Sequence, residues 1–93
     1  MYATRKGYRE VERIVKGFAN HRRVEILALL ANEPDLSVEG IAERLNINFK
    51  TASEHIRRIA LSGLVEKRYV GRSVHHRLTP RARNILTFLR MLE

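Results

Sequence analysis

The sequence contains no cysteine, only two prolines, and no long hydrophobic run. The absence of cysteine excludes disulfides, thiolate metal sites and thiol redox chemistry, and it fits an intracellular protein. The longest apolar stretch, ILALLA, is far too short to span a bilayer, and no signal peptide opens the chain, so no membrane partner is expected. With 93 residues, 44% hydrophobic and 30% charged, the composition indicates one globular domain.

Acidic residues are scarce in the second half of the chain. Residues 1–47 hold 8 Lys and Arg against 7 Asp and Glu, whereas residues 48–93 hold 10 against 3, which supplies +7 of the net charge of +8. A charge that serves only solubility is usually mixed in sign and spread along the chain. The basic half therefore favours a polyanionic partner, nucleic acid before membrane.

Apolar residues recur at helical spacing in five segments: 8–19, 21–31, 38–45, 49–61 and 80–92. Four polar residues are expected to cap the starts of the last four helices: Asn20, Ser37, Asn48 and Thr79. The three-residue turn NIN joins the third and fourth segments, and this is the spacing of a helix-turn-helix over residues 38–61. Residues 1–7 are expected to form a flexible basic arm.

The period of the sequence changes after Gly63. β-Branched and aromatic residues flank a Gly-containing turn, which predicts strands over residues 64–69 and 74–78 with the turn at Gly71 to Ser73. This hairpin, residues 64–78, is called the wing below. The expected fold is mainly α with a small β-hairpin, a single winged helix-turn-helix domain in the order ααα-α-ββ-α.

The helix over residues 49–61 has two unlike faces. Ala52, Ile56 and Ile59 form an apolar stripe that suits a core, and Phe49 at its edge is expected to be a core anchor. The opposite face carries long hydrogen-bonding side chains. Because a helix fits the major groove and its first turns reach base edges, this face is the best candidate for nucleic-acid recognition. Leu61 is an apolar residue on the outward side, and no role is predicted for it.

The candidate DNA-binding residues lie on this face and on the wing: Lys50, Thr51, Ser53, Glu54, Arg57, Arg58, Lys67, Arg68, Arg72 and Arg77. Glu54 could accept from a cytosine amino group, but we expect it to pair with Arg57 or Arg58 one turn on. Arg72, at the tip, is expected to probe a minor groove or a phosphate. The alternatives are a solvated helix face and charged protection of an edge strand.

The remaining polar residues predict no catalytic, metal or cofactor site. His75 and His76 are neighbours on a strand and should point to opposite faces, and His55 is expected to be a hydrogen bonder at the edge of the core. The sequence has no nucleophile–base pattern and no Gly-rich phosphate loop, so we do not expect an enzyme.

Three stretches of the chain together resemble the ArsR-type winged-helix transcriptional regulators. FANHRRVEIL is similar to the entry into the family's second helix, and Arg23 falls where that pattern carries an arginine. IAERLNINFKTASEHIRRI is similar to its helix-turn-helix, with Asn48 in the usual serine cap position. GLVEKRYVGRSVHHRLT is similar to its wing. The resemblance covers residues 18–92 and implies the fold and a role in DNA binding.

The first and last helices, residues 8–19 and 80–92, carry more apolar residues than a small core can cover, and the resemblance implies dimerisation through them. The expected interface residues are Val11, Ile14, Val15, Ile85, Phe88, Leu89, Met91 and Leu92. The alternative is that both helices merely cap the core. The resemblance does not extend to metal sensing, because Ser37 and Glu39 replace a C-x-C pair and the last helix has no His, with Glu93 its only acid.

The sequence thus predicts a dimeric, sequence-specific regulator of transcription that binds double-stranded DNA at an inverted repeat. It is expected to act as a repressor without a cofactor, in the cytoplasm at the nucleoid. Two alternatives remain: a winged-helix module that binds protein in a transcription or replication assembly, and a protein that coats DNA without sequence preference. The salt dependence of binding distinguishes a DNA-binding regulator from the protein-binding module, because phosphate contacts weaken steeply with salt and hydrophobic contacts do not.

Overall fold

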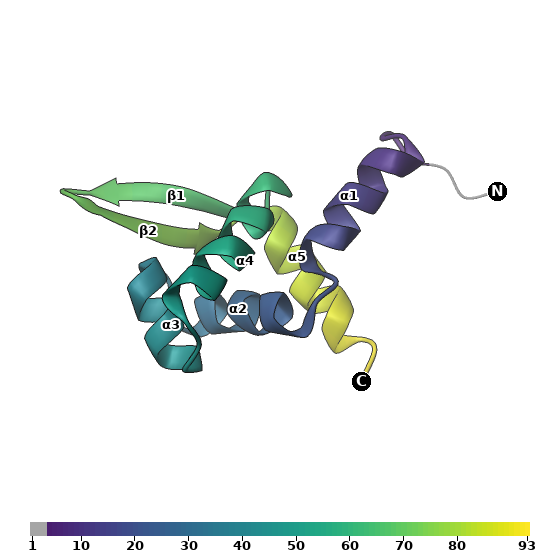
Figure 1. Ribbon diagram of the computed structural model, residues 1–93. Coiled ribbons are helices and arrows are strands. Elements are labelled where there is room, and N and C mark those ends of the chain that lie inside the picture. Colours follow the sequence, from purple (N-terminus) through teal and green to yellow (C-terminus); the bar gives the residue numbers. More distant parts are fainter. Residues whose placement is uncertain (1–3) are drawn as a thin grey trace.

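A computed structural model describes residues 4–93 and confirms the expected order of elements. The helices and strands are α1 (Tyr8–Phe18), α2 (His21–Asn32), α3 (Val38–Leu45), α4 (Phe49–Leu61), β1 (Val65–Val70), β2 (Ser73–Leu78) and α5 (Pro80–Arg90). The hairpin extends from one side of the helical body and α1 projects from the other (Figure 1). Of the expected arm, residues 1–3 lie outside the described residues, and residues 4–7 lead into α1 without helix. No helix within residues 4–93 is long and apolar enough to cross a membrane.

Side-chain caps fix where four of the helices begin. Asn20, Ser37, Asn48 and Thr79 each accept a hydrogen bond from a backbone N–H in the first turn of the helix that follows, as expected. A cap of this kind typically contributes about 1 kcal/mol. Asn46 ends α3 in the left-handed conformation, with φ 53°. The helix-turn-helix is therefore encoded locally, by polar residues at both ends of its turn.

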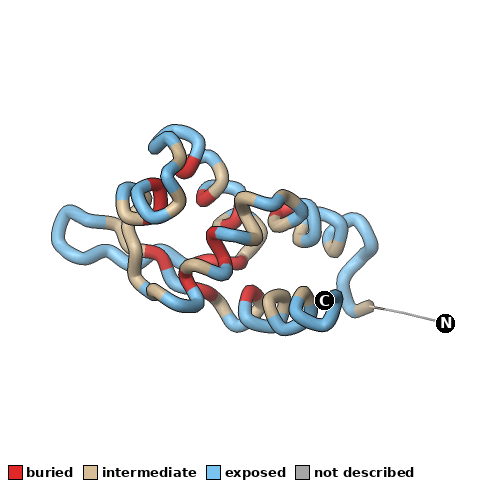
Figure 2. Tube along the Cα trace, turned by 90° about the horizontal axis from the view of Figure 1, so that it is seen from below, coloured by how far each residue is buried: buried red, intermediate tan, exposed pale blue. Residues whose placement is uncertain are grey.

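Helix α2 lies at the centre of the core. Ile26, Leu27 and Leu30 are at most 1% exposed, and α2 packs against α1, α4, α5 and β2. The buried positions gather in the middle of the molecule, while the tip of the hairpin is exposed throughout (Figure 2). The other buried apolar side chains come from α3, α4, the hairpin and α5: Ile41, Ala42, Ala52, Ile56, Ile59, Leu64, Val65, Leu78 and Ala82.

Phe49 is not the core anchor that the sequence predicts. It lies at the first position of α4 and is 52% exposed, whereas Ala52, three residues on, is fully buried. The prediction is wrong because the packing that covers the apolar stripe of α4 begins only at Ala52. The stripe itself is confirmed, since Ile56 and Ile59 are also buried.

The wing is a two-stranded antiparallel hairpin that runs from Val65 paired with Leu78 to Val70 paired with Ser73. Its turn contains only Gly71 and Arg72, because Ser73 already belongs to β2. Gly71 has a φ of 61°, which glycine adopts without a steric cost in two-residue hairpin turns. The strands and their approximate limits agree with the sequence prediction.

Buried His76 attaches the wing to the loop before α3. Its side chain is 1% exposed, and its Nδ1 lies 3.0 Å from the carbonyl oxygen of Leu36. The backbone adds two bonds, from His76 N to Leu36 O at 3.0 Å and from Asp35 N to His76 O at 3.1 Å. His75 and His76 point to opposite faces, as predicted, and the pairing of Leu36 with β2 is a contact that the sequence did not reveal.

The burial of His76 makes the stability of the fold depend on pH. Burial lowers the pKa of His76 from its ordinary value of 6.5, although the hydrogen bond to Leu36 opposes this shift. The unfolded chain therefore takes up a proton near pH 6.5 that the folded chain does not. This contribution to stability is complete above pH 6.5 and is lost as the pH falls below that value.

We expect the free energy of unfolding to decrease on acidification, by up to about 1.4 kcal/mol per pH unit below 6.5 for His76. Urea unfolding followed by circular dichroism at a series of pH values measures it. The variant His76→Gln keeps a donor for Leu36 but does not titrate, so its decrease should be smaller. The control His21→Gln changes an exposed histidine and should behave as the wild type does. Equal pH dependence in wild type and His76→Gln would contradict this role for His76.

Candidate nucleic-acid interface

Helix α4 presents a continuous polar face to solvent. Lys50, Thr51, Glu54, Arg57 and Arg58 are all exposed, and Ser53 is half-buried at the edge of the face. The first turn is held by the Asn48 side chain, whose Oδ1 accepts from Lys50 N at 2.7 Å and from Thr51 N at 3.3 Å. Lys50 and Thr51 are therefore presented from a capped and ordered helix start.

Glu54 holds the two arginines of this face, as the sequence predicts. Its carboxylate accepts two hydrogen bonds from Arg57, at 2.8 and 3.1 Å, and one from Arg58 at 3.2 Å. The hydrogen bonds from Arg57 are the main reason why the pKa of Glu54 falls to about 2. Glu54 is therefore ionised near neutral pH, and it limits the conformations available to both guanidinium groups.

A groove of about 300 Å³ separates α4 from the wing. Helix α4 contributes Ser53, Ile56 and Arg57 to its lining, and the hairpin contributes Lys67 and buried His76. Its lining also includes apolar residues, and Arg57 and Lys67 bring positive charge to it from α4 and from the wing. Residues ten or more positions apart in the sequence are brought together here, so α4 and the wing form one surface.

The alternation of the hairpin divides the basic residues that the sequence groups around one turn. Lys67 lies on the face that looks toward α4, whereas Arg68 and Arg77 lie on the opposite face. Arg72 occupies the turn, is exposed, and forms no ion pair within residues 4–93. Lys67 therefore lies on the side of the wing that continues the polar face of α4, and Arg72 lies at the tip. Arg68 and Arg77 lie at neither place.

Arg68 and Arg77 are both held by Asp35, a residue that the sequence analysis did not single out. Arg77 donates two hydrogen bonds to Asp35, each at 2.9 Å, and Arg68 donates one at 2.9 Å. The bond from Arg77 is the main cause of the lowered pKa of the Asp35 carboxyl, and it raises the pKa of Arg77 in turn. Asp35 has a φ of 67° in the loop between α2 and α3. No spacing or period in the sequence marks such a contact, which depends on how the loop meets the wing.

Arg23 connects three helices behind the recognition face. Its Nη1 donates to the carbonyl oxygens of Lys16 at 3.0 Å and Gly17 at 3.4 Å, so its positive charge stands at the C-terminal end of α1. Its Nε donates to Nδ1 of His55 on α4 at 3.2 Å. Burial lowers the pKa of His55, and the neighbouring Arg23 charge acts in the same direction. The expectation that His55 is a hydrogen bonder at the core edge is confirmed.

An apolar groove of about 590 Å³ runs between α1 and α5 on another side of the molecule. Five of the eight residues predicted for a dimer interface line it: Val11, Ile14, Val15, Ile85 and Phe88. Phe88 is 52% exposed there. The other three do not line the groove. Leu89 is half-buried, and Met91 and Leu92 follow the end of α5 and are exposed.

Both the sequence and the fold of this chain are similar to those of known bacterial regulatory proteins. Residues 20–67 match the model of the bacterial regulatory proteins of the arsR family. HTH-type transcriptional regulator Rv0324 of Mycobacterium tuberculosis is 39% identical over 69 residues, or 74% of this chain, and the chain spans 30% of that relative's length.

Two solved structures of relatives extend over nearly the whole chain. A Mycobacterium bovis fragment, described as a homodimeric winged helix-turn-helix DNA-binding domain, is 29% identical with a TM-score of 0.82, covering 98% of this chain and 89% of its own. HlyU from Vibrio cholerae is 27% identical with a TM-score of 0.80, covering 96% and 97% respectively.

The matched region runs from the cap of α2 into the first strand of the wing and includes the entire helix-turn-helix. It covers just over half of the chain, and the solved relatives share the remaining elements as well. The chain therefore belongs to the arsR family of bacterial regulatory proteins and has the winged helix-turn-helix fold of its solved relatives.

Proposed function

We propose that this protein is a dimeric repressor that binds double-stranded DNA at an inverted-repeat operator. The observation that carries this proposal is the exposed polar face of α4 beside the near side of the wing, with basic side chains on both sides of the groove between them. A capped helix of thirteen residues with such a face has the shape that fits a major groove. The M. bovis relative, described as a DNA-binding domain, supports the same assignment.

Within this surface, the first turns of α4 supply the contacts to base edges. Lys50 can donate to guanine acceptors, and the hydroxyl groups of Thr51 and Ser53 can serve bases or backbone. Arg57 and Arg58 lie further along the helix and meet phosphates, in orientations that Glu54 restricts. Such pre-ordering reduces the side-chain entropy that binding would otherwise cost.

The wing supplies contacts to the DNA backbone. Arg72 at the exposed turn reaches a phosphate or a minor groove. Lys67 contacts the backbone of the DNA strand that lies beside α4. Arg68 and Arg77 keep a second role, because their bonds to Asp35 fix the wing against the helical body. Their positive charge still adds to the field that attracts DNA.

The α1–α5 groove is proposed as the dimer interface. Its apolar lining and the exposed Phe88 are suited to burial against a second copy, and the M. bovis relative is described as homodimeric. A two-fold dimer presents two α4 helices, so it is expected to prefer an inverted repeat with half-sites about one helical turn apart, roughly 10 base pairs or a multiple. Occupying such a site at a promoter in the nucleoid blocks polymerase access, which is the basis for proposing repression.

The first prediction of this proposal concerns the dimer. Phe88 lines the groove, and Met91 is an exposed apolar residue just after the end of α5. Replacing both by Glu should give monomers at micromolar concentration and weaker DNA binding, because charge would replace apolar surface at and beside the proposed contact. Sedimentation velocity measures the change. Thr87→Glu is the matched control, since Thr87 lies on the same helix outside the groove lining and should leave the dimer intact. A wild-type chain that sediments as a folded monomer at all concentrations would refute the proposed interface.

The second prediction separates the helix from the wing. Lys50→Ala should weaken binding to the preferred duplex by roughly 1–3 kcal/mol and relax the choice at particular base pairs. Arg72→Ala should weaken binding to all duplexes about equally and reduce the log–log salt slope by roughly 1 for each phosphate that Arg72 neutralises in the wild-type complex. Fluorescence anisotropy with a duplex selected from a random pool and a scrambled duplex, over a range of salt, measures both effects.

Other results of this experiment would favour other docking modes. If Arg72 set base preference and Lys50 changed only the salt response, the roles of helix and wing would be reversed. If neither variant changed DNA binding and both failed to bind a protein partner instead, the chain would be an interaction module. A steep salt slope with no preferred duplex would indicate coating of DNA without sequence preference.

The third prediction is that DNA binding does not depend on metal. Ser37 and Glu39 are not thiolate ligands, α5 carries no histidine, and no group of three or more metal-binding side chains occurs within residues 4–93. Adding Zn²⁺ or a chelator should change the DNA affinity by less than about tenfold, or ~1.4 kcal/mol. A larger change in either direction, measured by anisotropy on the same duplex, would reveal a metal site.

A further inference from the structure

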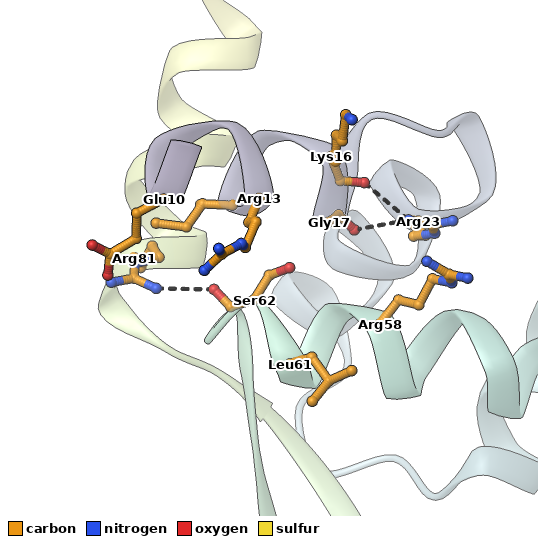
Figure 3. Close-up of a pocket in the computed structure, with 10 residues that line it drawn as sticks. Glu10, Arg13, Lys16, Gly17, Arg23, Arg58, Leu61, Ser62 and Arg81 are labelled. Atoms are coloured by element: carbon orange, nitrogen blue, oxygen red, sulfur yellow. Dashed lines mark hydrogen bonds between the residues drawn. The ribbon is translucent and has the colours of Figure 1, made fainter. Parts of the chain in front are cut away.

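A cationic pocket of about 500 Å³ lies where the ends of α1 and α4 meet the start of α5 (Figure 3). We use this name for the hollow lined by five basic side chains from four helices: Arg13, Lys16, Arg23, Arg58 and Arg81. Glu10 is the one carboxylate in its lining, and it is already paired with Lys6 at 3.3 Å. Two of the five cations have carboxylate partners outside the lining, Lys16 with Glu12 at 3.7 Å and Arg58 with Glu54 at 3.2 Å. The positive charge of the other three arginines is not offset by a carboxylate within residues 4–93.

Three of these arginines have no carboxylate partner within residues 4–93, and two of the three use their donors for neutral acceptors. Arg81 donates from Nη1 to the carbonyl oxygen of Ser62 at 2.9 Å, and Arg23 donates to the main chain of α1 and to His55. These acceptors are neutral, so they fix the guanidinium groups without cancelling their charge. Arg13 forms no hydrogen bond or ion pair within residues 4–93. The fold thus holds Arg23 and Arg81 in place around a hollow and leaves Arg13 at its wall, exposed and without a partner among the described residues.

The walls of the pocket are held together by a close contact between α1 and the end of α4. A Cβ added at buried Gly17 would lie 1.8 Å from the Ser62 hydroxyl oxygen, so only glycine permits this approach. Because like charges repel, bringing basic side chains of α1 and α4 to this junction costs free energy unless an anion shares the space. The close packing therefore forms the hollow and gathers positive charge there, which favours binding of an anion.

The pocket also has an apolar part. Ile14 lies in its lining, and Leu61, at the last position of α4, stands at its wall with 75% of its surface exposed (Figure 3). Neither the core nor the proposed DNA surface uses Leu61. We propose that the cationic pocket binds a small organic anion, a carboxylate or a phosphate monoester that carries a compact apolar group. The arginines hold the oxyanion by charge-assisted hydrogen bonds, and Leu61 covers the apolar group.

A bound anion would also affect DNA binding, a consequence that rests on the proposed function. Arg58 belongs to both surfaces, since it lines the pocket and lies on the polar face of α4. An anion that draws Arg58 toward the pocket removes a phosphate contact from the DNA side. It also ties α1, which belongs to the proposed dimer interface, to α4. The anion should therefore weaken DNA binding.

Nuclear magnetic resonance titration of the ¹⁵N-labelled full chain, without DNA, tests the site. Phenyl phosphate should shift the amides of Gly17, Leu61 and Ser62 in a saturable way and bind at least about tenfold more tightly than inorganic phosphate. Benzyl alcohol, which has the ring without the charge, should not bind. Arg13→Ala and Leu61→Ala should each weaken phenyl phosphate binding, and both replace exposed side chains, so the fold should persist. The matched control Arg83→Ala removes an exposed arginine of α5 outside the pocket and should leave binding unchanged.

Two results would overturn the proposal. Phenyl phosphate and inorganic phosphate could give the same weak shifts at basic residues throughout the chain, which would mean that the charge attracts anions without a site. Alternatively, Arg13→Ala could lower the salt slope of DNA binding while the free protein binds no phenyl phosphate, which would make the pocket a contact for the DNA backbone. DNA affinity measured without added anion remains a separate test, so failure of the site and failure of the proposed function are distinguishable.

Discussion

The burial of α2 is the constraint on which the rest of the fold depends. This helix is apolar on most of its surface, and the face that it leaves in water carries Glu25, Ala28 and Asn32. Fully burying a side chain such as Ile26, Leu27 or Leu30 contributes about 1.5–3 kcal/mol, and all three are at most 1% exposed. Helices α1, α4 and α5 and strand β2 pack around α2 to achieve this. The place of α4, and with it the polar face proposed to meet DNA, follows from covering this one helix.

Directional polar contacts then fix how the elements around α2 are oriented. Hydrophobic burial is not directional, so by itself it would allow α4 and the wing to slide. Arg23 joins the end of α1 to His55 on α4, and His76 joins the wing to Leu36. Asp35 holds two wing arginines from the far side of the hairpin. Each contact connects segments far apart in the sequence, and together they set the groove between α4 and the wing.

The fold also divides a basic half-chain into surfaces with different chemistry. On α4, Glu54 orders two arginines beside a capped helix start. On the wing, Arg72 stands alone at the turn while Arg68 and Arg77 are paired. At the junction of α1, α4 and α5, Arg23 and Arg81 are held by neutral carbonyl oxygens around a hollow. The basic residues behind the net charge of +8 therefore lie in three different environments, because their acidic partners are distributed unevenly among these surfaces.

Local chemistry in the chain specifies the helices and strands of this protein, because caps, helical spacing and turn glycines act within a few residues. Asn48 begins α4 and Gly71 turns the wing in the places that this chemistry requires. Packing between distant segments is what exposes Phe49, pairs Asp35 with Arg68 and Arg77, and places Leu61 at a cationic pocket. These outcomes depend on which segments cover a given side chain. Spacing along one element carries no information about that, because burial and ion pairing arise between elements.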